Sequence, residues 1–320
     1  MNRRHALGLL GATALTACAP AIQTGALGED PFEGGIGGTG IVGVMLASGS
    51  VLINGLRVEV PSFTRIFAGG QQSGESVLVP GKAMTIVART RLDRLEALRI
   101  DIDDPLTGIL QRTATGLAIN GSPVRLEPGA SGGDLIGRHV AASGLWRADG
   151  TLSGSLIRLA PAPRDSIAGV LTGSQSGGWR IGGTAIRHPS GQSLQSGQYA
   201  VATGRFDAGT LLADNIVMGR FRQGGDSLQQ LSVEGYLEPV NTTPGFRVAG
   251  LGHSFDRSLN LAPFADGRAV YFGRYTGLFN ARRAVVLPDS QSQRRKLLLP
   301  GDGQMFAAAL SDSARPIQNR

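Results

Sequence analysis

The chain has 320 residues, among them 48 Gly and 16 Pro, while aromatic residues make up 5% and charged residues 17%. This composition favours turn-dense β structure over helical bundles. A single Cys excludes intrachain disulfides, Cys-rich zinc sites and a CxxC redox pair. The formal net charge is +7, so an anionic partner has to be considered. The length exceeds one typical core and predicts several domains.

Residues 1–17 have the pattern of a secretory signal peptide. Arg3 and Arg4 precede an apolar run over residues 6–15, and small residues lead to Cys18. The apolar run is much shorter than the ~20 residues of a membrane-spanning helix. Residues 15–18, Leu-Thr-Ala-Cys, resemble the bacterial lipoprotein box, in which the Cys is lipidated and the chain is cut just before it. We therefore predict export, with the membrane as a partner through a lipid anchor on Cys18.

Two points about export stay open. Arg3 and Arg4 resemble a twin-arginine signal, so the route is either twin-arginine or the general secretory one. A soluble periplasmic protein that loses Cys18 with its signal is the alternative to a lipoprotein. Ala19 follows the Cys, and by resemblance to enterobacterial sorting this favours the periplasmic side of the outer membrane over retention at the inner membrane.

One short pattern occurs four times along the chain. It consists of an aliphatic residue, any residue, Gly, two residues and usually another aliphatic residue. The four glycines are Gly55, Gly121, Gly183 and Gly250. In the first two copies the Gly follows Asn54 or Asn120, and Asn-Gly predicts a type I′ hairpin turn.

Two further patterns follow each copy in the same order. The second is a Gly followed by an alternating apolar segment, which is typical of a strand, and it begins at Gly81, Gly137, Gly197 and Gly267. Three of these segments are expected to end at Gly144, Gly204 and Gly273. The third pattern, as in Leu95-x-Ala97-x-x-Ile100, recurs at residues 152–157, 211–216 and 279–284. Three ordered elements repeated four times predict four small antiparallel barrels or strongly bent sheets.

Residues 91–100 contain strong helix formers with Leu at a spacing of three, and in isolation they would favour a helix. Their counterparts at residues 146–157 contain Asp149-Gly150, which predicts a turn between strands. We therefore expect a hairpin here as well.

The repeat pattern, the lipoprotein-like start and the Gly-rich run over residues 34–40 together resemble a bacterial family of tandem small β-barrels, a domain of unknown function. The resemblance covers residues 34 to about 287. It implies an OB-like architecture and an envelope location, and it implies no catalytic residue.

The predicted fold class is therefore all-β, with four tandem small OB-like β-barrel repeats. The predicted divisions are a signal peptide (1–17), a Gly-rich leader (18–39), repeats at 40–104, 105–163, 164–225 and 226–288, and a partly disordered tail (289–320). Within the tail, a short helix near residues 304–310 is compatible with the sequence.

Several motifs that resemble catalytic or binding signatures lack the context that their chemistry needs. The GxGxxG pattern at residues 35–40 has neither a strand before it nor a helix after it. Ser131 lies in a GxSxG pattern, but Pro128 and Gly137 exclude the strand-to-helix turn of a nucleophile elbow. Asp101, Asp103 and Asp104 lack calcium-loop spacing and are interpreted as a solvated strand end. We predict no catalytic residue, cofactor or metal site.

Basic residues concentrate near the carboxyl end, at Arg282, Arg283, Arg294, Arg295 and Lys296. They are interpreted either as a solvated tail or as a contact with an anionic envelope surface. Aromatic residues are too few for the stacking platform of a single-strand nucleic-acid binder, so nucleic acid is a disfavoured partner.

Three functions are weighed on this basis. Repetition without a catalytic constellation favours a non-catalytic envelope lipoprotein that binds an unknown protein or glycan. The alternative is a cationic OB-like binder of acidic polysaccharide or nucleic acid. An envelope hydrolase is the weakest hypothesis, because no carboxylate pair is placed by a motif.

Overall fold

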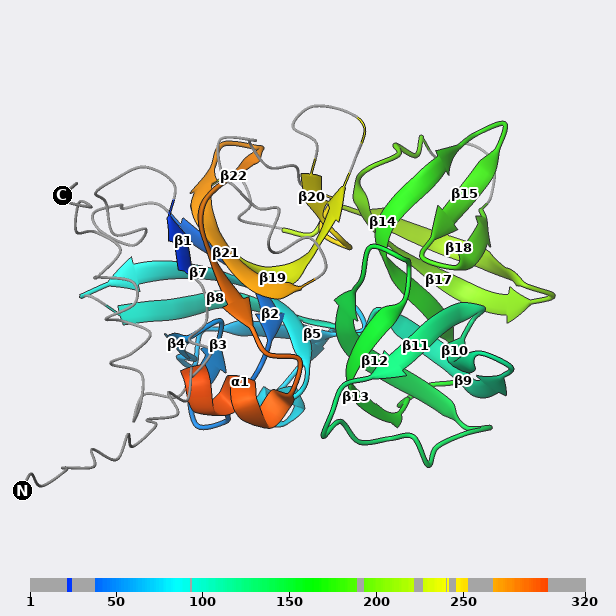
Figure 1. Ribbon diagram of the computed structural model, residues 1–320, viewed down its shortest axis with the longest axis horizontal. Helices are drawn as coiled ribbons and strands as arrows, with labels where there is room; N and C mark the ends of the chain where they lie inside the picture. Colours follow the sequence, from blue (N-terminus) through cyan, green and yellow to red (C-terminus); the bar gives the residue numbers. More distant parts are fainter. Residues whose placement is uncertain are drawn as a thin grey trace, which may run out of the picture.

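The computed structural model describes residues 22–24, 38–92, 94–188, 193–221, 227–239, 241, 246–252 and 267–298, and for 22–24 and 246 it describes the backbone alone. The protein is all-β, and its strands form two curled sheets, drawn at the left and right of Figure 1. The described residues include one 3-10 turn, η1 (Glu75–Val77), and one α-helix, α1 (Gln291–Leu298). The predicted all-β class is confirmed.

The 12-stranded sheet combines the first and last parts of the chain. Unit 1, residues 38–103, contains β2 (Gly38–Val44), β3 (Val51–Ile53), β4 (Leu56–Glu59), β5 (Arg65–Ala68), β6 (Gln71–Ser73), β7 (Ala83–Arg91) and β8 (Arg94–Asp103). Unit 4, residues 228–287, contains β19 (Leu228–Pro239), β20 (Phe246–Val248), β21 (Arg268–Tyr275) and β22 (Phe279–Leu287). The parallel pairing of β2 with β19 joins the two units. A further strand, β1 (Ile22–Thr24), pairs antiparallel with β22.

The 10-stranded sheet is formed by the middle of the chain. Unit 2, residues 106–159, contains β9 (Leu106–Thr113), β10 (Gly116–Ile119), β11 (Ser122–Leu126), β12 (His139–Trp146) and β13 (Leu152–Leu159). Unit 3, residues 165–218, contains β14 (Asp165–Ser174), β15 (Gly178–Ile181), β16 (Thr184–Arg187), β17 (Tyr199–Asp207) and β18 (Thr210–Met218). In unit 2 the pairing of β9 with β10 closes a five-stranded ring, and in unit 3 the pairing of β14 with β17 does the same.

The four units share a strand-pairing scheme. In each, the first strand pairs antiparallel with the strand that begins the final hairpin, as β9 does with β12 and β14 with β17. That hairpin contains a register shift in every unit, at Ala88, Gly144, Gly204 and Gly273. A Cβ placed on Gly144, Gly204 or Gly273 would lie within about 2.1 Å of a carbonyl oxygen on the other strand of the hairpin. These glycines therefore allow the bulges, and the strands continue past the positions where the sequence predicted an end.

Two Asn-Gly turns also join neighbouring units. Asn54 (φ 55°) and Asn120 (φ 50°) both adopt the left-handed region, each followed by a Gly with positive φ, as predicted for type I′ turns. The buried Asn120 amide donates to the Thr107 carbonyl at 2.8 Å, within unit 2, and to Ser166 of unit 3 at 3.4 Å. The Asn54 amide likewise reaches Ser232 of unit 4, at 3.2 Å to its carbonyl oxygen.

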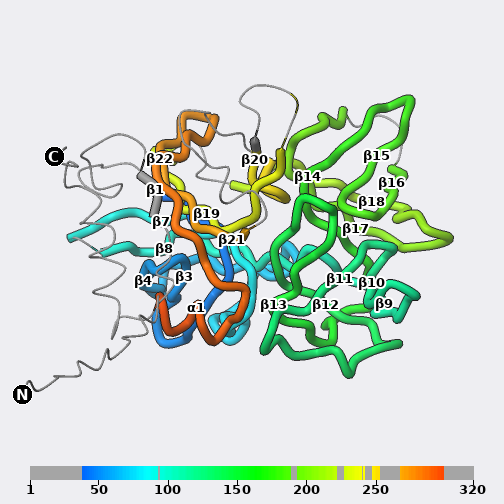
Figure 2. Tube along the Cα trace, viewed as in Figure 1, coloured from blue at the N-terminus to red at the C-terminus, as the bar shows by residue number. Residues whose placement is uncertain are grey.

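The hydrophobic core is divided among the units and the joints between them. The largest buried cluster lies mainly in units 2 and 3, where it includes Trp146 and Trp179, and it extends into unit 1 at Val44 and into unit 4 at Tyr236. Another lies where α1 follows β22 and approaches β3, at the lower left of Figure 2, and it includes Leu52, Leu287 and Leu298. Helix α1 is therefore packed against the sheet.

Most predicted boundaries fall between strands, at the β8–β9, β13–β14 and β18–β19 connections. The hairpin predicted over residues 91–100 is confirmed, because β7 and β8 pair antiparallel. The leader was predicted to precede the first barrel, but β1 lies inside it and β2 begins at Gly38. Residues 291–298, within the predicted tail, form α1, while residues 304–310 lie outside the described part of the chain.

We predict that Gly108→Ala destabilises the protein by about 2 kcal/mol, because the added Cβ would lie 2.1 Å from Oδ1 of the buried Asn120 side chain. The free energy of unfolding from urea titration measures the effect. Gly74→Ala is the matched control, since Gly74 has φ −89° and a Cβ added there would have no atom within 4 Å. Equal losses in the two variants would contradict the turn-to-strand packing.

Candidate functional site

The most strongly charged place inside the protein is a buried network of two arginines and two glutamates. Glu127 follows β11 in unit 2, Glu234 lies on β19, Arg268 begins β21, and Arg294 lies on α1. Their side chains are at most 3% exposed. The network therefore joins the 10-stranded sheet, the 12-stranded sheet and the C-terminal helix. We call these four residues the buried ion network.

The Glu127 carboxylate is shared between two guanidinium groups. Arg268 and Arg294 each donate to one of its oxygens, and Ser153 adds a hydroxyl donor at 3.4 Å. The second carboxylate, on Glu234, accepts from Arg268 Nε at 2.7 Å and from the backbone N–H of Val44 at 2.8 Å. Glu234 therefore also ties unit 4 to strand β2 of unit 1.

Electrostatics favour the ionised forms of Glu127 and Arg268. Burial alone would raise the pKa of Glu127, but the charges of Arg268 and Arg294 and their hydrogen bonds outweigh it and hold this pKa below the ordinary value of 4.5. Burial would lower the pKa of Arg268, yet the charges of Glu234 and Glu127 raise it above its ordinary value. A buried arginine without these carboxylates would be strongly unfavourable.

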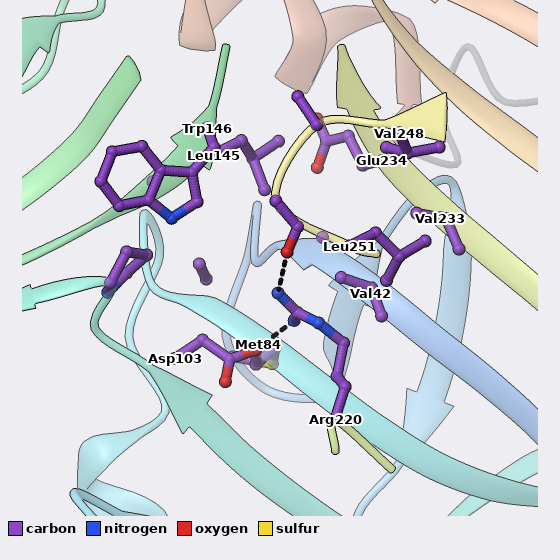
Figure 3. A pocket seen from close by; sticks show the side chains of 16 residues that line it. Val42, Met84, Asp103, Leu145, Trp146, Arg220, Val233, Glu234, Val248 and Leu251 are labelled. Atoms are coloured by element: carbon purple, nitrogen blue, oxygen red, sulfur yellow. Dashed lines mark hydrogen bonds and ion pairs between the residues drawn. The ribbon is translucent and has the colours of Figure 1, made fainter. Parts of the chain in front are cut away.

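A second charged contact lies where all four units approach one another. Arg220, in the segment that leaves unit 3, donates to Asp103 Oδ2 and to Thr85 Oγ1, both at 2.8 Å and both in unit 1. Its guanidinium carbon lies 4.0 Å from the centroid of the Tyr199 ring. Figure 3 shows Arg220 reaching Asp103 on one side and the backbone of residue 250 on the other.

The cavity beside Arg220 is small. Its volume is about 20 Å³, and its wall includes Val42, Met84, Leu145 and Val248 (Figure 3). A space of this size holds a single water molecule. Trp146 fills the adjoining volume, because its ring packs against residues of units 3 and 4 and its Nε1 donates to the Ala168 carbonyl at 2.7 Å. The units are therefore packed closely against one another around Arg220 and Trp146.

The structure separates the five basic residues that the sequence grouped together. Arg295 and Lys296 are exposed in the last turn of α1, and Arg282 is exposed on β22 while Arg283 is half-buried there. Arg294 was predicted as a candidate contact for an anionic surface, but its side chain is 0% exposed and belongs to the buried ion network. The prediction is corrected for Arg294, because a guanidinium inside the protein cannot meet an external anion. Cys18 lies outside the described residues.

The acidic group at the end of β8 was also misinterpreted as solvated. Asp103 contacts Arg220, and Asp104 pairs with Lys82 at 2.7 Å. Asp104 also accepts from Ser143 of unit 2. These carboxylates therefore fix unit 1 against its neighbours, with partners up to 117 residues away in sequence. A local sequence pattern could not have revealed such partners.

One histidine has a carboxylate partner that the sequence did not indicate. His139 Nε2 on β12 lies 3.1 Å from Asp165 on β14, and Asp165 also accepts from the Phe206 backbone N–H at 2.7 Å. The His139–Asp165 pair therefore joins units 2 and 3.

Ser131, the serine of the GxSxG pattern, is exposed, and its backbone carbonyl accepts a hydrogen bond from the Ile157 N–H.

Among the residues that the structure describes, no group of three His, Cys, Asp or Glu side chains could hold a metal ion. Within the same residues, no helix is long and apolar enough to cross a membrane. Comparison with protein-family models, curated proteins and solved structures finds no match to this chain.

We predict that the free energy of unfolding falls as the pH drops below about 4.5. The pKa of Glu127 is lower in the folded protein than its ordinary value of 4.5, so its stabilising contribution is complete above that pH and is lost as the pH falls through the folded pKa. The measurement is urea unfolding between pH 7 and pH 3, for the wild type and Glu127→Gln.

Because Gln does not titrate, the variant should lose less stability over this pH range than the wild type loses. It starts from a lower stability at neutral pH, since Arg268 and Arg294 then lack their shared charge. Parallel pH profiles for the two proteins would contradict an ionised Glu127 in the folded state.

Proposed function

We propose that the chain is a non-catalytic exported lipoprotein that serves as a binding or scaffold protein of the bacterial cell envelope. A lipid on Cys18 would anchor it to the periplasmic side of the outer membrane, and a soluble periplasmic form is the alternative. The remaining chain would present four barrels to a protein or glycan partner. The observation that carries this proposal is the buried ion network, which holds units 1, 2 and 4 and α1 in one fixed arrangement.

The proposal includes an OB-like barrel for each of the four units. The OB-fold is a small five-stranded Greek-key barrel. The closed strand rings of units 2 and 3 support it, as does the parallel pairing of β11 with β13 and of β16 with β18. Unit 1 has the corresponding parallel pair, β4 with β8. Unit 4 has the corresponding final hairpin and bulge.

The use made of charged side chains supports a scaffold over an enzyme. The buried ion network, Arg220–Asp103 and Lys82–Asp104 all lie at contacts between units or within unit 1 beside such a contact. A hydrolase needs ionisable groups facing a space that admits substrate. The described cavity beside Arg220 has room for one water.

A polyanion binder is supported less well than a scaffold. Such a protein needs a continuous groove of cations that are available to phosphate or carboxylate groups. Several exposed arginines of the described surface pair with acidic neighbours, giving mixed charge: Arg89 with Glu96, Arg94 with Glu59, Arg164 with Asp214, and Arg205 with Asp207.

We predict that cells given an alkyne-tagged fatty acid label the wild-type protein and not Cys18→Ala, because this position carries the only thiol in the chain. The wild type should fractionate with the outer membrane and the variant with soluble periplasmic proteins. Gel fluorescence after coupling to the alkyne, together with membrane fractionation, measures both effects. Labelling of Cys18→Ala equal to that of the wild type would contradict lipidation.

The scaffold half of the proposal is tested in the same cells after chemical cross-linking. The lipidated protein should be captured with one partner at constant stoichiometry, and the unanchored variant should lose that partner. Capture of the protein as a single species under native expression would contradict a scaffold.

A further inference from the structure

The outer edge of β22 carries a strand that comes from the opposite end of the chain. One edge of β22 pairs with β21, and on the other edge β1 pairs antiparallel with residues 283–285. Figure 1 draws β1 in dark blue close to β22 in orange. Strand β1 ends the strand order of the 12-stranded sheet, so it covers backbone groups that an edge strand leaves open to other chains.

In units 1 and 2 the same stretch of the last strand is contacted from within the unit. In the repeated pattern, residues 99–101 of β8 correspond to residues 283–285 of β22. In unit 1 this stretch pairs in parallel with β5. In unit 2 the N–H of the corresponding Ile157 donates to the Ser131 carbonyl. The repeat therefore has a position on its last strand that accepts another segment, and in unit 4 β1 occupies it.

Strand β1 differs in direction and position from the strands that close the other units. Strands β4, β11 and β16 run parallel to the last strand of their units and pair with its first residues, before the bulge. Strand β1 runs antiparallel and pairs after the bulge. Residues 22–24 are Ile-Gln-Thr, and β-branched residues such as Ile and Thr favour an extended strand. The leader therefore supplies an added strand to unit 4.

The stretch of β22 that receives β1 is firmly packed. Ala284 is 0% exposed and Val285 is 3% exposed. Val285 lies in the buried cluster that also contains Leu52 and Leu298, and Ala284 lies in the main cluster of unit 4. A segment paired with these residues is therefore attached to a rigid part of the sheet.

The pairing shortens the tether between Cys18 and the body of the protein. Cys18 precedes Ile22 by four positions and precedes β2, at Gly38, by twenty positions. An extended chain spans at most ~3.6 Å per residue, so residue 18 lies within ~14 Å of Ile22, whereas a tether running free to β2 could extend ~70 Å. The order β1-β22-β21-β19-β2 separates β1 from β2 by four strand spacings, ~19 Å in all, which the intervening residues 25–37 are long enough to cover.

We propose that β1 is a clasp that fastens the N-terminal tether to the outer edge of β22. The occupant of this edge is the chain's own leader, and we call the pairing of residues 22–24 with residues 283–285 the β1 clasp. With a lipid on Cys18, the clasp holds the β22 edge of unit 4 beside the bilayer, so the body stands close to the membrane in a defined orientation. That orientation rests on the proposed function, whereas the clasp itself needs no lipid.

The first experiment traps the clasp as a disulfide in the Cys18→Ala chain, which has no other thiol. Gln23→Cys and Ala284→Cys place two thiols at directly paired positions. Paired Cα atoms of antiparallel strands lie about 4.5–5.5 Å apart, within the range that a disulfide bridges. We expect mild oxidation to bridge most of this protein within one chain. Non-reducing gels and peptide mass spectrometry measure the bridge.

Gln23→Cys with Leu278→Cys is the matched control. Leu278 is exposed at the β21–β22 turn, six positions before residue 284 and about 20 Å away along the strand. This pair should give roughly tenfold less bridged protein, because its thiols are too far apart. Equal bridging of the two pairs would overturn the clasp. Bridges between two chains would also overturn it, since the edge would then hold the leader of a second copy.

The second experiment measures how far the lipidated protein stands from a bilayer of phosphatidylethanolamine and phosphatidylglycerol. A donor dye on Leu278→Cys and an acceptor in the headgroup layer report the distance by energy transfer. Gln23→Pro should open the clasp, because Pro has no N–H to pair within a strand. A twenty-residue flexible tether then replaces a four-residue one, so the distance should grow by about 10 Å or more. Ala26→Pro, outside the paired residues, is the matched control and should leave the distance unchanged.

Equal energy transfer in the wild type and Gln23→Pro would overturn the proposed position at the membrane. The two proposals fail separately. Absence of fatty-acid labelling at Cys18 would remove the lipid anchor, but disulfide trapping would still decide the clasp, because it uses the Cys18→Ala chain.

Discussion

The arrangement of this protein depends on one carboxylate shared by two buried guanidinium groups. Glu127 belongs to the unit 2 part of the 10-stranded sheet. Arg268 belongs to the 12-stranded sheet, and Arg294 belongs to helix α1. Moving these charges out of water is costly, and only the set of contacts among the four side chains offsets that cost. Removal of one partner from such a set typically costs about 3–5 kcal/mol, because the remaining charge stays buried. The contacts of Glu127 with Arg268 and Arg294 therefore hold the two sheets in position relative to each other.

The filled contacts between the units limit where another molecule could bind. The contacts between units are filled by Trp146, by paired charges and by a cavity of about 20 Å³. The outer surfaces of the two sheets remain available to other molecules. In the proposed scaffold, rigidly joined units would display such surfaces at a defined spacing, which suits recognition of an extended partner.

The sequence predicted local backbone conformations, but it did not predict ion pairs between residues far apart in the chain. Asn54-Gly55 and Asn120-Gly121 predicted their turns, and the repeated glycines marked the final hairpins, because these positions need conformations or close approaches that only a few residues allow. The repeat comparison also overruled the helical propensity of residues 91–100. By contrast, Arg294 was taken for a surface residue, since its partner Glu127 is 167 residues away. Strand β1 was missed because three residues of a Gly-rich leader carry no alternating pattern.

The central claim is that the buried ion network makes the two sheets one cooperative structure. Differential scanning calorimetry of residues 19–320 tests it most directly. The account predicts one transition for the wild type, with equal calorimetric and van 't Hoff enthalpies. It predicts that Glu127→Ala separates melting of the two sheets, whereas the exposed-pair control Asp214→Ala does not. Two resolved transitions in the wild type, or an unchanged single transition in Glu127→Ala, would contradict it.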